Sequence, residues 1–219
     1  MNFKHINKLE AKLKSRTKSK YCILTSSGTS ALITILKGLD YPKNSEIIIP
    51  SFACQAVAFS VVYSNLKPIL CDVNEDDFNI NPKSLESKIT GKTKAIVAVH
   101  TFGRKYSKEI RGICKRNNLE IIEDACQSFG SVYKDKYHGT LERVGLTSFG
   151  KLKIIDADGG GAIFTNDKKL YEKMVQFISH VDSYSNVFDN NRILEYYTSV
   201  LVRRLHKYAN INLYGSVLF

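Results

Sequence analysis

The sequence contains three short stretches whose residue types could carry out chemistry, and each follows or includes a run of apolar residues. They are "TSSGTSAL" at 25–32, "EIIEDACQSFG" at 120–130 and "SFGKLKIIDADGGGAIF" at 148–164. The first offers hydroxyl groups, the second two carboxylates and an amide, and the third two amines. Ligands of open parallel α/β sheets bind beyond the carboxyl ends of the strands, so these stretches are the candidates for a site.

The first stretch has the composition of a phosphate-binding helix start. Ser27, Thr29 and Ser30 supply hydroxyl groups. The backbone N–H groups of residues 28–30 would point out of a helix N-terminus, where an anion is favoured. An ordinary helix cap is the alternative, because Ser and Thr commonly begin helices. These residues alone leave both interpretations open.

The second stretch places two acidic residues at the end of an apolar run. Alternation along a strand puts Glu123 and Asp124 on opposite sides, so that one carboxylate can point into a site. A buried carboxylate is costly unless it meets a cation or several donors. Gln127 follows three residues on and could share the pocket. An acid that caps the next segment is the alternative interpretation.

The third stretch combines Lys151 and Lys153 with glycines at 159, 160 and 161. A lysine acts as a nucleophile only when its amine is deprotonated, which desolvation or a neighbouring positive charge favours. Glycine lets the backbone pass close to a bound group and adopt conformations that side chains forbid. The alternative is a surface lysine beside a hairpin turn.

The elements that must position these stretches alternate along the chain. Strand-like apolar runs occupy 21–25, 46–50, 68–73, 94–100, 120–124, 145–150 and 160–166. Helical patterns occupy 29–39, 52–66, 82–89, 107–118 and 168–180. Apolar strands separated by helices predict an α/β protein of three layers with a largely parallel central sheet.

We divide the chain into a basic N-terminal helix at 1–20, a large domain at 21–180, and a helical start of an incomplete C-terminal region at 181–219. The apolar residues expected to face inward from the first helix are Phe3, Ile6, Leu9 and Leu13.

Composition and charge argue against several other classes of protein. The formal charge is +11, but residues 1–20 hold seven basic residues and one acidic residue, which is +6 of that total. No nucleic-acid-binding motif follows, so we expect a solvated basic face or attraction of a phosphorylated small molecule, and no nucleic acid. The five scattered cysteines predict neither a disulfide framework nor a metal site. Without an apolar run of membrane length or a secretory signal, we expect a cytoplasmic protein.

Together and in this order, the three stretches resemble the sugar aminotransferases of the DegT/StrS family, which depend on pyridoxal 5'-phosphate (PLP) and share the fold type I architecture. The resemblance runs from about residue 20 to 180 and includes "EIIIPSF", "PILCDVNEDDFNINP", "TKAIVAVHTFG" and "GGAIFTND". It implies PLP as cofactor, an amino acid donor such as glutamate, and a nucleotide-linked keto-sugar as acceptor, in amino-sugar and polysaccharide biosynthesis. It also implies a homodimer, provided that the chain folds stably.

The resemblance implies a role for each matched residue. Gly28, Thr29 and Ser30 would hold the cofactor phosphate, and Ser148 would add a hydroxyl group. Asp124 would pair with the pyridine nitrogen, and Gln127 would bond the ring 3-hydroxyl. The family's lysine lies five residues after the serine, which selects Lys153 over Lys151. That amine would bind the cofactor and move a proton between the donor's Cα and the cofactor's C4′.

The sequence also departs from the family pattern. Cys54 stands where relatives usually carry an aromatic residue that stacks on the cofactor, Ile154 replaces an asparagine, and Gly159 replaces an acidic residue. Relatives carry a C-terminal domain before which this chain ends, so we expect a shortened product or a separate chain that completes it.

Three other functions stay open. A non-catalytic remnant or binding module would keep the fold alone, and a basic nucleic-acid binder would use the surface charge. A PLP-dependent sugar dehydratase would carry histidine in place of Lys153. His100 and His180 fall near element ends and receive no role, and the sequence does not identify the sugar.

Overall fold

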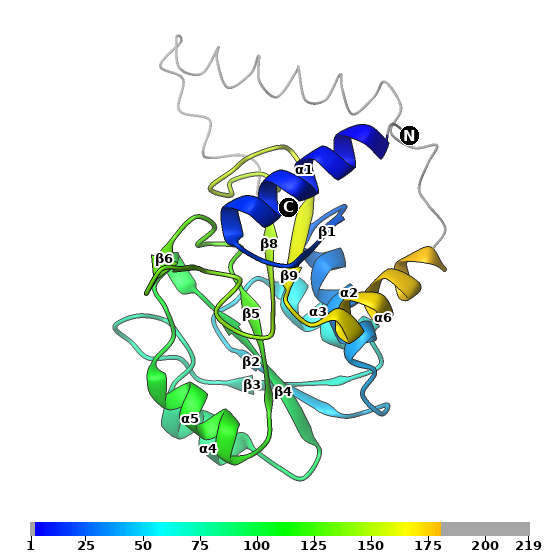
Figure 1. Cartoon of the computed structure of the whole chain (residues 1–219). Helices are drawn as coiled ribbons and strands as arrows, with labels where there is room; N and C mark the ends of the chain where they lie inside the picture. The colour runs from blue at the N-terminus through cyan, green and yellow to red at the C-terminus, as the bar shows by residue number, and fades with distance from the viewer. Residues whose placement is uncertain (1–2, 181–219) are drawn as a thin grey trace, which may run out of the picture. The chain divides into compact units, whose positions relative to one another are not determined.

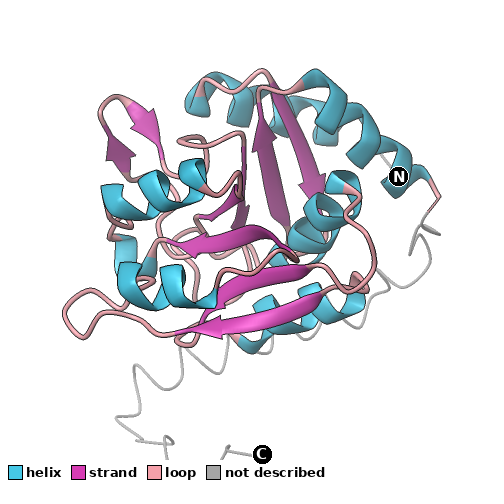
Figure 2. Cartoon of the chain, turned by 90° about the horizontal axis from the view of Figure 1, so that it is seen from below, coloured by secondary structure: helices cyan, strands magenta, loops and turns pink. Residues whose placement is uncertain are grey.

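A computed structural model describes residues 3–180 of the chain, and the helices expected at 181–219 lie outside the described residues. The described part is a central sheet with helices on both faces (Figures 1 and 2). The sheet strands are β1 (Tyr21–Thr25), β2 (Glu46–Pro50), β3 (Lys67–Cys71), β4 (Thr93–Val99), β5 (Glu120–Asp124), β8 (Val144–Ser148) and β9 (Gly161–Thr165). The α-helices are α1 (Phe3–Thr17), α2 (Gly28–Leu39), α3 (Gln55–Tyr63), α4 (Pro82–Lys88), α5 (Lys108–Arg116) and α6 (Lys168–Ser179).

The seven strands lie in the order β1-β9-β8-β5-β4-β2-β3. Every pairing from β8 to β3 is parallel, whereas β9 runs antiparallel to both of its neighbours, β8 and β1. The predicted α/β fold with a largely parallel sheet is therefore confirmed. A separate two-stranded hairpin, β6 (Val132–Tyr133) and β7 (Lys136–Tyr137), was not predicted.

Alternate residues of the central strands feed two apolar cores, one on each face of the sheet. In β2, Ile47 and Ile49 pack with α2, α3 and α6, whereas Ile48 packs with α4 and α5. All five residues of β2 are buried. This burial on both faces explains why the parallel strands are continuously apolar in sequence.

Helix α1 covers the sheet near β1 and β9 and carries the basic face predicted for it. Leu13 of α1 packs with Cys22 and Phe164 in a third, smaller core. The expectation that Leu9 faces inward is wrong, because its side chain is 44% exposed. Helix α1 therefore packs on the domain through the turn that carries Leu13.

Side-chain caps start the helices where the sequence changes from strand to helix. Ser27, Asn81 and Asp167 each accept a hydrogen bond from the backbone N–H three residues on. Pro82 occupies the first turn of α4, where its missing N–H has no partner to lose. Within residues 3–180, none of the helices has the length and apolar character needed to cross a membrane.

Candidate active site

The three stretches singled out in the sequence meet at one edge of the sheet. Thr25 at the end of β1 and Ser148 at the end of β8 both pair with Gly161, the first residue of β9. Asp124 ends β5 and pairs with Leu146 of β8. The carboxyl ends of β1, β5 and β8 and the amino end of β9 therefore form one rim.

The start of α2 contributes backbone N–H groups and hydroxyl groups to this rim. Ser27 and Ser30 form a reciprocal capping box, in which each side chain accepts a hydrogen bond from the other's backbone N–H. The Ser30 hydroxyl also contacts Ser26 and Ser27, so it serves the cap in this structure. Thr29, the other predicted phosphate ligand, is half-buried, and its hydroxyl group is not part of the capping box.

Gly28 fits where any larger residue would collide with the rest of the rim. A Cβ atom at Gly28 would lie 2.9 Å from Ser148 Cβ and 3.1 Å from Cys126 Sγ. The predicted residues of the first and third stretches are therefore in contact range, and the second stretch touches both through Cys126. The bare backbone of Gly28 therefore lets α2 pack closely against the ends of β5 and β8.

Glu123 and Asp124 point to opposite sides of β5, as strand alternation predicts. Asp124 Oδ1 accepts the backbone N–H of Cys126 at 2.8 Å, on the side of the rim. Glu123 is fully buried on the other side, where His100 Nε2 lies 2.7 Å from its carboxylate. Asp124 is thus the carboxylate that the site can use.

Gln127 lies beside the rim with its amide oxygen already engaged. Its Oε1 accepts the backbone N–H of Phe102 at 3.0 Å. Phe102 adopts a left-handed backbone conformation, with φ of 51°, and its ring lies 6.1 Å from that of Phe52. A bond from Gln127 to a ligand would therefore use its Nε2 group.

The two lysines of the third stretch have different surroundings. Lys151 is 56% exposed and forms an ion pair with Asp158 at 3.3 Å from Nζ to Oδ1. Lys153 is half-buried, and its backbone N–H donates to the carbonyl of Gly150 in a tight turn. The structure thus separates the lysine that has a surface partner from the lysine on the inner side of the loop.

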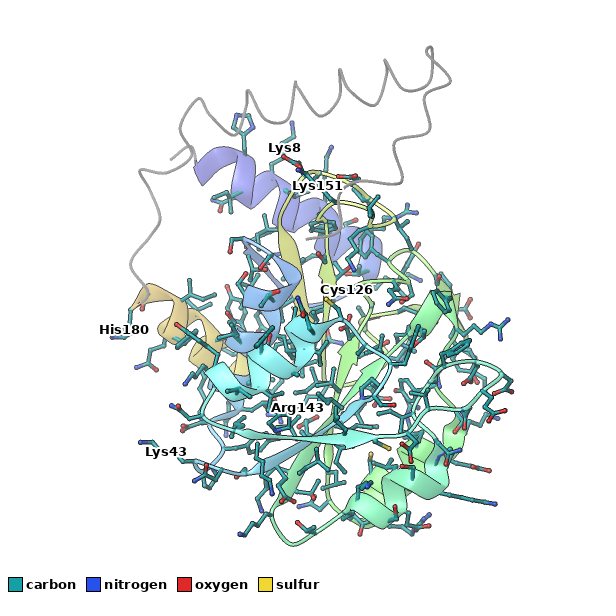
Figure 3. All side chains as sticks on the ribbon, turned by 180° about the vertical axis from the view of Figure 1, so that it is seen from behind. Lys8, Lys43, Cys126, Arg143, Lys151 and His180 are labelled. Carbon is teal, nitrogen blue, oxygen red and sulfur yellow. The ribbon has the colours of Figure 1, made fainter. Side chains whose placement is uncertain are left out.

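Cys126 is the point at which the predicted groups converge, and it was not predicted as a site residue. Burial raises the pKa of its thiol well above the usual value, and the Asp124 carboxylate raises that pKa further, whereas the Lys153 ammonium lowers it. The Asp124 carboxylate also accepts the backbone N–H of Cys126. Figure 3 labels Cys126 near the middle of the view and Lys151 near its edge. Its position two residues after Asp124, at a strand end, is the only sequence signal for it.

The glycine run packs tightly against the loop before α2. The sequence predicted that these glycines let the backbone pass close to a bound group and adopt conformations that side chains forbid. A Cβ atom at Gly161 would lie 2.6 Å from the carbonyl oxygen of Ser27 and 2.9 Å from the nitrogen of Gly28. Gly160 has φ of 97° and donates its N–H to the carbonyl of Ser26. The run therefore packs β9 against the loop that begins α2.

Several other polar residues lie away from this rim. His100 is buried beneath it, and His180 is an exposed residue at the end of α6. A shallow basic hollow of about 660 Å³ opens on the surface of α1. Its lining residues are Lys8, Ala11, Lys12, Ser15, Arg16 and Tyr137. None of them belongs to the predicted site.

Known proteins match this chain over its described part and beyond. The model of the DegT/DnrJ/EryC1/StrS aminotransferase family matches residues 1–212. GDP-perosamine synthase of Escherichia coli O157:H7 is 36% identical over 174 residues, which cover 79% of this chain and 48% of that enzyme.

Solved structures of aminotransferase-like enzymes also match this chain. An aminotransferase from Psychrobacter cryohalolentis matches with a TM-score of 0.76 and 34% identity, over 83% of this chain and 47% of that chain. GDP-4-keto-6-deoxy-D-mannose-3-dehydratase of E. coli, solved with bound hydrated PLP, matches with a TM-score of 0.72 and 26% identity, over 78% and 46%. The chain spans about half the length of the curated relatives it matches.

Proposed function

The chain belongs to the DegT/DnrJ/EryC1/StrS aminotransferase family, and from this premise we propose that it binds PLP and transfers an amino group from an amino acid to a nucleotide-linked keto-sugar. Glutamate is the proposed donor. One observation carries the proposal: Asp124, whose Oδ1 accepts the N–H of Cys126, and Ser148 both meet the start of α2 at Gly28, through Cys126 and directly. We place the reaction in the cytoplasm, where the five free cysteines would stay reduced.

The residues of the rim fit the chemistry of PLP. The absence of a side chain at Gly28 brings Ser148 close to the N-terminus of α2, where backbone N–H groups favour an anionic phosphate. The hydroxyl groups of Thr29 and Ser148 would donate hydrogen bonds to that phosphate. The Asp124 carboxylate would accept a hydrogen bond from the protonated ring nitrogen. Ser30 would act mainly through the cap, since its hydroxyl is bonded there.

When bound, PLP supplies an electron-withdrawing ring that allows the Cα–H bond of the amino donor to break. Lys153 would hold the cofactor covalently and, once released, move the proton between the donor's Cα and C4′. Asp124 would keep the ring nitrogen protonated, and Gln127 would donate to the 3-hydroxyl through Nε2. The half-buried position of Lys153 keeps bulk water partly away from the amine.

The test uses the full chain with added PLP. We expect visible absorbance on binding and, after borohydride reduction, a PLP-modified peptide that contains Lys153. Lys153→Ala should lose both signals, whereas Lys151→Ala should keep them, because Lys151 is tied to Asp158 at the surface. Modification of Lys151 in the wild-type chain would contradict the assignment.

Amine transfer separates the enzyme from the binding module. With glutamate and a nucleotide-linked keto-sugar, an enzyme releases 2-oxoglutarate in step with the aminated sugar. Colour without 2-oxoglutarate would favour a non-catalytic remnant. A dehydratase would consume the keto-sugar without incorporating the amine.

We further propose that two copies pair through the outer face of α3. Phe59, Val62 and Tyr63 lie on one side of this helix and are 57–69% exposed, beside Leu70 of the edge strand β3. Light scattering should give the mass of a dimer, and Phe59→Lys should lower it toward that of a monomer. Val175→Lys, on exposed α6, is the control that should leave the mass unchanged. A monomeric wild-type chain at micromolar concentration would refute the pairing.

A further inference from the structure

Behind Asp124, on the face of β5 turned away from the rim, lies a carboxylate whose hydrogen bonds are all made inside the protein. The side chains of Glu123 and His100 are both 0% exposed. Glu123 accepts four N–H donors: His100 Nε2 at 2.7 Å, and the backbone N–H groups of Gly139 at 2.8 Å, Leu141 at 2.7 Å and Glu142 at 3.2 Å. With both oxygens engaged, this side chain has one orientation.

His100 bonds both residues at the end of β5. Its backbone N–H donates to the carbonyl of Asp124 at 3.0 Å, and its ring Nε2 is bonded to Glu123. Because Glu123 as a carboxylate only accepts, the proton of His100 lies on Nε2. The main chain of one acidic residue and the side chain of the next are therefore held by a single histidine.

The other ring nitrogen of His100 is left without a partner. Its Nδ1 is buried and unbonded, and its ring stacks on His138 at 4.0 Å between centroids, with 20° between the planes. An apolar residue at position 100 would leave the buried Glu123 carboxylate one donor short, which is destabilising. The imidazole is therefore required for the bond that it makes through Nε2.

The turn at 139–142, whose backbone N–H groups bond Glu123, packs tightly against β8. Gly139 has φ of 91°, and a Cβ atom at Gly145 of β8 would lie 2.4 Å from the Gly139 carbonyl oxygen. The turn thus sits directly on the strand next to β5. Glu123 joins the ends of β4 and β5 to this turn, which leaves the end of β5 no freedom to rotate.

We propose that Glu123 and His100 are positioning residues for Asp124. Successive residues of a strand point to opposite faces, so a rotation of the backbone at the end of β5 that turns Asp124 away from the rim must pull Glu123 out of its four hydrogen bonds. The pair thereby keeps the Asp124 carboxylate bonded to the Cys126 N–H, preorganised for a cationic ring nitrogen. This inference rests on the proposed function, in which Asp124 meets the pyridine of PLP.

The experiment compares Glu123→Gln with Glu46→Gln in the full chain. Glu46 is a buried acid at the opposite end of the same sheet, where Thr90 and Lys67 bond it, so it matches the burial of Glu123 without facing the site. His100→Gln is the milder second variant, because its amide can still donate to Glu123. Thermal melting reports how much each variant loses in stability.

The first readout is amide exchange at Cys126 in the protein without added PLP, measured by NMR. The Cys126 N–H is protected by Asp124 Oδ1 at 2.8 Å. We expect exchange to rise by about tenfold or more in Glu123→Gln and His100→Gln, the change that accompanies loss of a hydrogen bond of ordinary net strength. Glu46→Gln should leave it unchanged at the same loss of melting temperature. Unchanged exchange in the first two variants, or an equal rise in all three, would overturn the positioning role.

The second readout is the affinity for PLP, from titration of the visible absorbance. Glu123→Gln should raise the Kd by about tenfold, approaching Asp124→Asn, and Glu46→Gln should not. An unaltered Kd with altered exchange would also refute the role, since Asp124 would then need no positioning. If the wild-type chain does not bind PLP, the proposed function fails, while the exchange experiment still decides whether Glu123 and His100 hold Asp124.

Discussion

Gly161 is the residue at which the rim tolerates the least change. A Cβ atom there would lie 2.6 Å from the Ser27 carbonyl oxygen and 2.7 Å from its carbonyl carbon, and backbone atoms on both sides cannot move independently. We expect Gly161→Ala to destabilise the fold by about 1–3 kcal/mol, the range for overpacked sites. For a chain of this size that lowers the melting temperature by roughly 2–4 °C for each kcal/mol.

Gly159→Ala is the matched control within the same glycine run. A Cβ atom at Gly159 meets only the Ser26 carbonyl oxygen, at 4.0 Å. Calorimetry of both variants should show a large loss for position 161 and a small one for position 159. Equal melting temperatures in the two variants would show that the loop before α2 yields to the added methyl group.

Which residues share the rim could be predicted from sequence, but the bonds that each one makes could not. The position of Asp124 after an apolar strand placed it at the edge, and alternation separated it from Glu123. Which of the two faces the rim depends on donors 16 to 23 residues away along the chain, namely His100 and the turn at Gly139. Sequence spacing carries no information about such partners.

At the scale of elements, the alternation of strands and helices was predictable because burial on both faces leaves continuous apolar runs. The direction of β9 does not follow from that alternation, although the chain contains the reason for it. The loop at 149–160 holds twelve residues and no helix, whereas the crossover to a parallel neighbour of β8 would usually contain a helix. β9 therefore returns antiparallel, and Gly161 reaches the rim at the start of its strand.

Helix α3 and the hairpin show what apolar pattern alone misses. A helix was expected at 52–66, but α3 spans Gln55–Tyr63. The N–H of Ser51 donates to the carbonyl of Cys71, and Asn65 turns left-handed with φ of 64°.

In the β6-β7 hairpin, Lys134 and Asp135 both have positive φ, at 47° and 63°. Without the Asn-Gly signal that usually marks such a turn, the pattern does not predict it.

At the scale of the whole molecule, net charge says little about the site. The basic residues of α1 border an open hollow that shares no residue with the rim. The candidate site instead depends on a few groups whose charges nearly balance, the Asp124 carboxylate and the Lys153 amine. A surplus of basic residues is therefore better understood as a property of the surface than as evidence about chemistry.

The stability of the described domain should depend on pH through His138. Its side chain is 3% exposed, and burial lowers its pKa from 6.5 to about 4, helped by the His100 ring stacked on it and by Lys105, while Glu123 opposes the shift. The folded pKa is below the unfolded one, so the contribution of His138 is complete above pH 6.5 and is lost as the pH falls toward 4. Integrated over that window, it amounts to at most about 3 kcal/mol.

The free energy of unfolding, measured with denaturant at about pH 7.5, 6.5, 5.5 and 4.5, checks this expectation. His138→Asn cannot take up the proton, so its stability should fall less steeply between pH 6.5 and 4.5 than that of the wild-type chain. His5→Asn, at an exposed position of α1, should follow the wild-type curve. If His138→Asn and the wild-type chain lose stability in parallel, the acid sensitivity arises at another group.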